Sequence, residues 1–360
     1  MKTLLRSVIA IISIIFISLP LMAQDNYLTF DLANGKDFVH GVGEVEVIDK
    51  RQSPTDTLGI IRAGKMNGKR PLLSKQALNK DIENYFNSLS AISKYPSDKK
   101  LVVLIYKFSG NETGTGYTDE NAEFVFAADY FLSDQQNKYH LLGMVDTIIK
   151  VSSIDVTKKL LRSIDQSLCY LYEHTYTTHP ADKHPYTIEE VRRYDDIEKN
   201  SHPAFTADHF PNGMYGTWKN FLALQKEEDR KIGKKKKKFK IESLSESGKI
   251  KYSPVPVKTK VIAYEGKAYI NFGNVFYPLS KMDNDFYFTG RLGEVQRNTG
   301  VIVGAGLMFG TVGVLIVVKG NEPPGLDGST LDGILYDFKV EARTGKAIVL
   351  RKSIRPKVTI

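Results

Sequence analysis

The fold is decided by three apolar stretches: LVVLIYKF at residues 101–108, EFVFAADYFL at 123–132 and YHLLGMVDTIIKV at 139–151. All three are rich in β-branched and aromatic residues. The first is an almost unbroken apolar run, as expected of a strand buried on both faces, and the second alternates between apolar and polar positions. The stretches therefore predict three successive β-strands.

Two further strands and two helices flank these runs. Apolar residues predict a strand around 42–48 and a short one at 58–61. Helical spacing predicts a helix over 78–92, with Ser74 as its N-cap, and a second helix with an apolar stripe over 160–172. The order strand, strand, helix, strand, strand, strand, helix predicts an α/β layer sandwich of the α+β class.

The motif Val47-Ile48-Asp49-Lys50-Arg51, followed by Leu58-Gly59, a helix and the strand 101–108, carries a resemblance. Over roughly residues 40–174 the chain resembles periplasmic domains of auxiliary lipoproteins in Gram-negative envelope transport systems. Those proteins carry a lipid on a cysteine at the cleavage point of the signal. The single cysteine here, Cys169, lies deep in the chain at an apolar helix position, so lipid anchoring does not carry over. We interpret Cys169 as a small buried hydrophobic residue.

The second half of the chain has a different composition. A stretch rich in His, Pro and Asp precedes the motif Pro-x-Gly-x-Tyr at 211–215, and a short aromatic helix capped by Thr217 follows that motif. Strands are then predicted at 261–264, 268–272, 275–279 and 286–288, with a last hairpin of 335–342 and 347–350. With the Tyr-Ile-Asn strand at 269–271, this half is similar to a domain that recurs in uncharacterised exported Gram-negative envelope proteins.

The predicted plan has four parts: a signal peptide at 1–23, an α+β domain at 24–174, a His- and Pro-rich linker with one helical turn at 175–209, and a mainly β domain at 210–360. The signal peptide is predicted from Lys2 and Arg6, the apolar core 8–19 and Ala23. That core is about a dozen residues, shorter than the ~20 that cross a bilayer. We therefore expect export to the periplasm of a Gram-negative bacterium.

The positive charge of the chain is concentrated in one run. The formal net charge is +9, and removing Lys2 and Arg6 with the signal leaves +7. Eight positive residues lie within 230–240, so the remainder carries about −1. A nucleic-acid binder spreads its basic residues over a folded face, so we predict no nucleic-acid partner. The run is interpreted either as a solvated loop or as a contact with an anionic surface through Lys234, Lys235, Lys236, Lys237 and Lys238.

The stretch 299–318 has no charged residue and matches the bilayer core in length at about 20 residues. Its glycines are Gly300, Gly304, Gly306, Gly310 and Gly313, and two of the intervals are Gly-x-x-x-Gly. Three interpretations stay open: a membrane-inserted apolar helix, a buried strand pair of the second domain, or a self-associating insertion.

The histidines of the predicted linker are the remaining candidates for chemistry. His174, His179 and His184 are spaced by five residues, which matches none of the usual zinc spacings. The sequence shows no catalytic constellation and implies no cofactor. The leading hypothesis is a non-enzymatic, membrane-associated envelope component in assembly, transport or scaffolding, with membrane lipid or another envelope protein as partner. The alternative is a soluble periplasmic enzyme or metal-binding protein that uses these histidines.

Overall fold

The computed structural model describes residues 27–30, 38, 41–52, 54–63, 68–95, 97–112, 120–153, 156–175, 180, 184–227, 230–236, 238–272, 274–291 and 335–353. The chain divides into two compact units, Met1–Arg192 and Arg193–Ile360. The structure is mixed α+β, with many strands, few helices and several sheets, which confirms the predicted class.

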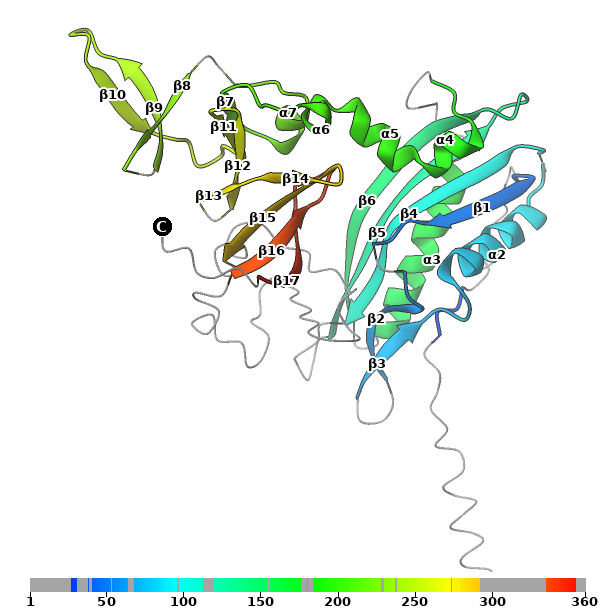
Figure 1. Cartoon of the computed structure of the whole chain (residues 1–360). Helices are drawn as coiled ribbons and strands as arrows, with labels where there is room; N and C mark the ends of the chain where they lie inside the picture. The colour runs from blue at the N-terminus through cyan, green and yellow to red at the C-terminus, as the bar shows by residue number, and fades with distance from the viewer. Residues whose placement is uncertain are drawn as a thin grey trace, which may run out of the picture. The chain divides into compact units, whose positions relative to one another are not determined.

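The first unit is built on one six-stranded sheet (Figure 1). Its strands are β1 (Glu44–Asp49), β2 (Thr57–Ala63), β3 (Gly68–Leu73), β4 (Lys100–Glu112), β5 (Glu120–Ser133) and β6 (Tyr139–Ser153). Strands β4, β5 and β6 form an antiparallel meander, and β1 and β2 both run parallel to β4. The three apolar stretches thus form adjacent strands, each longer than its apolar run.

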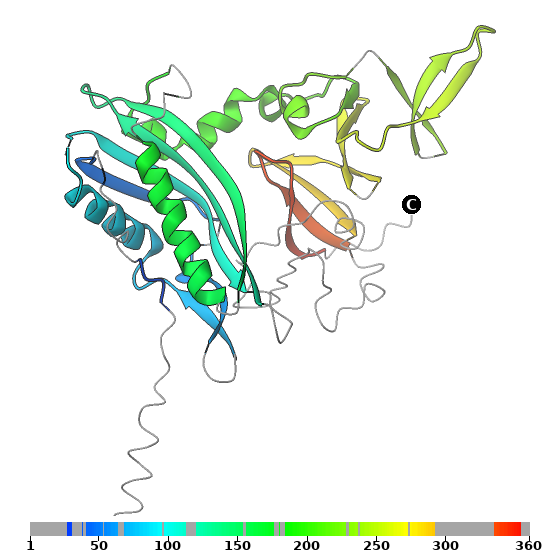
Figure 2. The same ribbon diagram turned by 180° about the vertical axis from the view of Figure 1, so that it is seen from behind.

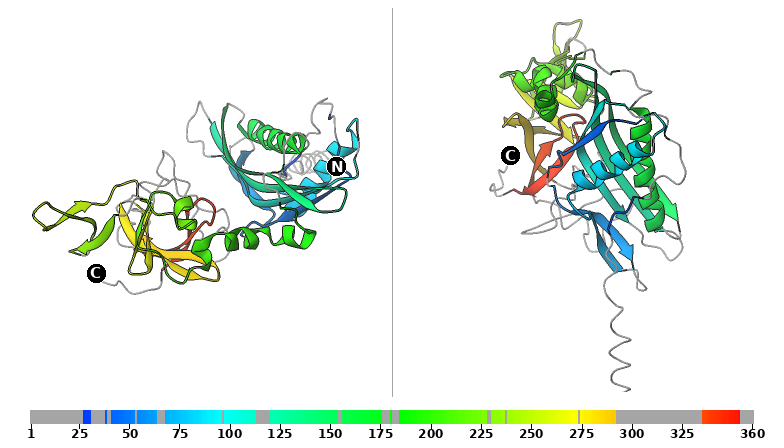
Figure 3. Two further views of the ribbon diagram at one scale, coloured as in Figure 1. Left: turned by 90° about the horizontal axis from the view of Figure 1, so that it is seen from above. Right: turned by 90° about the vertical axis from the view of Figure 1, so that its right-hand side faces the viewer.

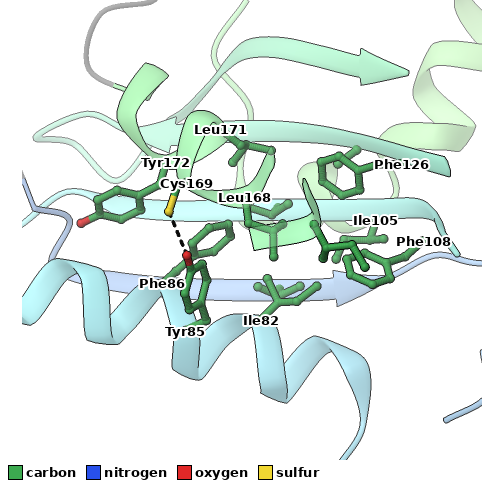
Figure 4. Close-up of a cluster of buried hydrophobic side chains, with 14 of the residues drawn as sticks. Ile82, Tyr85, Phe86, Ile105, Phe108, Phe126, Leu168, Cys169, Leu171 and Tyr172 are labelled. Carbon is green, nitrogen blue, oxygen red and sulfur yellow. Dashed lines mark hydrogen bonds between the residues drawn. The ribbon is translucent and has the colours of Figure 1, made fainter. Parts of the chain in front are cut away.

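Two helices, α2 (Leu78–Ala91) and α3 (Val156–His174), cover one face of this sheet (Figure 2). Their apolar stripes meet the inward residues of β4 and β5 in a single core. Phe86 and Tyr172 stack with ring centroids 5.8 Å apart, and Phe126 lies in the same cluster (Figure 4). Cys169 is buried there and lies 2.8 Å from the Tyr85 hydroxyl, which confirms its interpretation as a core residue.

Two local expectations in this unit were wrong. Strand β3 was not predicted, because GKRPLL offers little alternation and contains Pro71, which cannot donate to a ladder. The unit therefore has the order β-β-β-α-β-β-β-α. Ser74 does not cap α2: the N-cap is Ala77, without a side-chain hydrogen bond. The Ser74 hydroxyl instead donates to Asp81 at 2.6 Å, and Asp81 also accepts the Lys75 amide at 2.8 Å.

The second unit contains three smaller sheets. The first two are β7 (Gly213–Tyr215) with β11 (Val261–Tyr264), β12 (Lys267–Phe272) and β13 (Val275–Pro278), and β14 (Ser280–Met282) with β15 (Asp285–Arg291), β16 (Leu335–Val340) and β17 (Ala347–Lys352). The third comprises β8 (Lys231–Lys235), β9 (Lys238–Leu244) and β10 (Ile250–Pro254).

An aromatic core joins the two four-stranded sheets. Phe288 stacks between Phe272 and Phe338, with centroids 5.0 and 4.7 Å away. The short helix α7 (Trp218–Leu222) adds Trp218 and Phe221 to this core. Thr217 caps α7 as predicted, since its hydroxyl accepts the Asn220 amide at 3.1 Å.

The segment predicted as a linker contains three short helices among its described residues. These are α4 (Ile188–Arg192), which belongs to the first unit, and α5 (Tyr194–Ser201) and α6 (Pro203–Thr206), which belong to the second. The Lys199 amine lies 2.9 Å from the buried carboxylate of Asp285, and the Lys281 amine donates to the Phe205 carbonyl at 2.9 Å. Long-range polar contacts therefore hold α5 and α6 on the second unit.

Candidate membrane-facing surface

The lysine run is a β-hairpin and not a loop. Strands β8 and β9 pair antiparallel in the register Lys231↔Glu242 to Lys235↔Lys238, so two residues connect the paired ends. The third strand, β10, pairs with the outer side of β9 (Figure 1, Figure 3). Of the five lysines predicted to contact an anionic surface, Lys237 lies outside the described residues.

One face of this sheet packs on the rest of the second unit. Ile232 and Ile241 are paired across β8 and β9 and are buried together with Met214 and Ile262. Because directly opposed residues share a face, Lys234 and its partner Phe239 point to the same inner side.

Lys234 is held in an aromatic cage. Its amine lies 4.9 Å from the ring centre of Phe239, 5.1 Å from Tyr264 and 4.9 Å from Tyr269. Each such cation–π contact is worth about 0.5–1 kcal/mol at an exposed site. Lys234 therefore fixes the hairpin to β11 and β12 on the face opposite to Lys235 and Lys238, and its contact with an anionic surface stays a prediction.

The opposite face carries charge and apolar surface together. Lys231, Lys235 and Lys238 are exposed on it, and the Lys235 amine lies 4.8 Å from the ring centre of Tyr252 on β10. The only acid facing them on these three strands is Glu242, 3.4 Å from the Lys231 amine. This face, hereafter the basic face, comprises Lys231, Lys235, Lys238, Lys240, Glu242, Leu244, Ile250 and Tyr252.

The apolar part of the basic face was not singled out from the sequence. Leu244 and Ile250 are directly paired, with exposed fractions of 78% and 52%, and Tyr252 is 38% exposed. The alternation in IKYSP at 250–254 was the available signal, but a strand of five residues with one lysine is too short to be predicted from periodicity.

The tip of the hairpin has a strained backbone. Lys236 has a φ of +47°, in the left-handed region where a residue with a side chain is disfavoured by roughly 1–2 kcal/mol. Hairpin turns of this kind are ordinarily filled by Asn or Gly. A lysine at this position therefore costs stability while it adds charge to the tip.

The apolar stretch 299–318 with Gly300, Gly304, Gly306, Gly310 and Gly313 lies outside the described residues. Its anchoring points are nevertheless defined. Strands β15 and β16 are antiparallel neighbours, and the last residue of β15, Arg291, pairs with the first residue of β16, Leu335. The described strands before and after residues 292–334 are thus directly paired.

Among the helices that the structure describes, none has the length and apolarity needed to span a bilayer. The prediction for 299–318 stays a prediction, since that stretch was not among them.

The histidine candidates are not brought together in the described part of the chain. His174 lies against its own helix, with its Nδ1 2.9 Å from the Tyr170 carbonyl oxygen and its ring 3.8 Å from that of Tyr170. His184 packs edge-on against Tyr186 at 4.8 Å. His179 is outside the described residues, within which no three His, Cys, Asp or Glu side chains form a group suited to a metal ion.

Comparison with solved structures finds several similar chains, two of which are described here. No family model matches the sequence, and no curated protein matches it. The Xanthomonas campestris protein XCC0632, whose description names the family DUF330, is similar over 42% of this chain and 93% of its own, with 10% identity and a TM-score of 0.29. A second, uncharacterized protein is similar over 41% of this chain and 96% of its own, with 12% identity and a TM-score of 0.24. Neither likeness assigns an activity.

Proposed function

We propose that this chain is an exported component of a Gram-negative cell envelope that associates with a membrane from the periplasmic side and serves assembly, transport or scaffolding without catalysing a reaction. The proposal is supported by the signal-peptide pattern of residues 1–23 and by the uncharged stretch 299–318. The resemblance of residues 40–174 to periplasmic domains points to the same compartment.

The observation that carries the proposal is the uncharged stretch 299–318, and the pairing of Arg291 with Leu335 limits how that stretch could contact a membrane. A single crossing by 299–318 would leave β15 and β16 on opposite sides of the bilayer, although they are hydrogen-bonded neighbours. Membrane contact through this stretch therefore has to enter and leave on one side. We accordingly replace the sequence-based transmembrane helix by a one-sided insertion, which keeps the sheet intact.

The pairing also makes a clean deletion feasible. Because Arg291 and Leu335 are directly opposed, Asn-Gly in place of 292–334 closes β15 and β16 as a two-residue hairpin. This turn-closed variant retains every described residue. We expect the full chain to stay in the membrane pellet after a high-salt wash, and the turn-closed variant to be released by that wash.

A second variant keeps the length of residues 292–334 but makes them charged. In this variant the insertion stays, and two of its small residues, Gly304 and Gly306, become Asp, because charge at bilayer depth is costly. We expect it to be released by the wash as well. Recovery of the full chain in the soluble fraction, without salt or detergent, overturns the proposal.

A further inference from the structure

We propose that the basic face of the β8–β9–β10 sheet is a docking surface for an anionic phospholipid bilayer, separate from the insertion 292–334. This docking surface rests on the proposed function and adds to it the class of lipid that is bound.

The charge on this face is one-sided. Lys231, Lys235, Lys238 and Lys240 share it with a single acid, Glu242, which is already engaged by Lys231. Lys236 adds a further exposed charge at the tip. Clustered lysines near an anionic leaflet gain attraction with each added charge, and Glu242 is the only acid on these three strands.

The apolar residues on the same face select a bilayer over a soluble polyanion. Leu244 and Ile250 lie side by side and exposed, one register step from Tyr252. Aliphatic side chains that enter the headgroup boundary, a tyrosine at that level and lysines that reach the phosphates form the pattern of an interfacial surface. A polyphosphate chain offers the two aliphatic side chains no apolar surface to contact.

Packing of the opposite face fixes the sheet, so that the basic face is exposed to solvent. Ile232 and Ile241 bury the opposite face, and the cage of Phe239, Tyr264 and Tyr269 holds Lys234 there. A face that is fixed by packing does not need to be ordered when it binds, so less conformational entropy is lost on docking.

The test uses the turn-closed variant, so that the insertion cannot contribute, and the full mature chain beside it. Binding is measured by co-sedimentation with phosphatidylcholine vesicles that contain or lack phosphatidylglycerol. Changing Lys231, Lys235, Lys238 and Lys240 to Gln is expected to weaken partitioning onto phosphatidylglycerol vesicles at least about tenfold. The matched control changes four exposed lysines elsewhere, namely Lys69, Lys75, Lys99 and Lys219, to Gln and is expected to bind as the parent does.

A second pair of variants tests the apolar contribution. Leu244→Ser with Ile250→Ser is expected to weaken vesicle binding severalfold at both low and high salt, since apolar burial is not screened. The control is Ile92→Ser with Met144→Ser, which removes exposed apolar side chains from the first unit and leaves binding unchanged.

The proposal is overturned if binding is equal to vesicles with and without phosphatidylglycerol, or if the control lysine set weakens binding as much as the basic-face set does. It is also overturned if the protein does not bind vesicles but binds heparin, a soluble polyanion, and the Leu244 and Ile250 changes leave the heparin affinity unchanged. If the full chain is released from membranes by salt but the turn-closed variant still selects phosphatidylglycerol, the one-sided insertion fails and the docking surface stands. If the full chain stays in the pellet after the salt wash but the turn-closed variant does not select phosphatidylglycerol, the docking surface fails and the one-sided insertion stands.

Discussion

At the scale of single residues, the clearest structural requirement lies at Gly59. This residue has a φ of +148°, and a Cβ added to it would lie 1.9 Å from the carbonyl oxygen of Gly110. The obstacle is backbone, so it cannot move aside as a side chain would. Gly59 belongs to the Leu58-Gly59 pair on which the resemblance partly rests, and the close approach of β2 to β4 supplies its physical reason.

Gly59→Ala is therefore expected to destabilise the first unit by at least about 2 kcal/mol, through strain and separation of the two strands. Urea unfolding followed by tyrosine fluorescence measures this free energy. Gly68→Ala is the control, because no atom lies within 4 Å of its added Cβ. Equal stability of the two variants contradicts the tight β2–β4 junction.

Lys236 is expected to lower the stability of the second unit through its backbone conformation and to strengthen vesicle binding through its charge. Its φ of +47° suits glycine, so Lys236→Gly is expected to raise the unfolding free energy of the second unit by up to about 1 kcal/mol and to lower binding to phosphatidylglycerol vesicles. Lys238→Gly removes an equal charge from strand β9, where glycine is unfavourable, and is expected to lower both. Thermal unfolding beside co-sedimentation separates the two effects. A less stable Lys236→Gly variant contradicts the strained turn.

At the scale of elements, Lys260 links the packing of β12 to pH. Burial lowers the pKa of this lysine to about 8, and its amine lies 4.0 Å from the ring centre of Phe272. The unfolded chain keeps the ordinary value of 10.5. Between these two values the unfolded state holds a proton that the folded state has lost, so this lysine makes stability rise with pH across that window.

We expect Lys260→Met to be more stable than the parent by about 1 kcal/mol at pH 7, because no charge is then buried. The difference should shrink as pH rises from about 8 and be smallest above 10.5, where the Lys260 amine becomes neutral in the unfolded state as well as the folded one. Denaturant unfolding at both pH values measures it, with the exposed Lys219→Met as control. A Lys260→Met variant less stable at pH 7 shows that the cation–π contact outweighs the burial cost.

The elements that the sequence predicts well are those with enough residues to show a period. The meander 101–151 and the helix beginning at Leu78 are of this kind. Helices α5 and α6 show no such pattern, because their positions depend on distant residues such as Asp285 and Lys281. Long-range ion pairs leave no local trace in a sequence.

The candidate site could be predicted only in part for a related reason. In the run Lys234–Lys238 every position carries the same residue, so alternation between the two faces of a strand cannot be detected. The sequence therefore predicts one common surface for Lys234, Lys235 and Lys238, although Lys234 lies on the opposite face of the hairpin from the other two. Its cage partners Tyr264 and Tyr269 are about 30 residues downstream in the chain, and only the fold brings them together.

At the scale of the whole molecule, the arrangement of the second unit constrains any membrane contact. Strands β14 to β17 form one continuous sheet although the chain leaves it for residues 292–334. Because β15 and β16 pair with each other, both strands must lie on the same side of any membrane. The central claim is therefore topological: the chain meets the membrane from a single side.

Thiol labelling of the membrane-bound full chain tests that claim most directly. Met282→Cys precedes the insertion and Lys346→Cys follows it, and the buried Cys169 is the internal negative control. With a membrane-impermeant maleimide added to sealed spheroplasts, we predict that both introduced cysteines are labelled alike and Cys169 is not. Labelling of one introduced cysteine while the other reacts only after the membrane is opened would show that the chain crosses the bilayer between them, and would contradict the account.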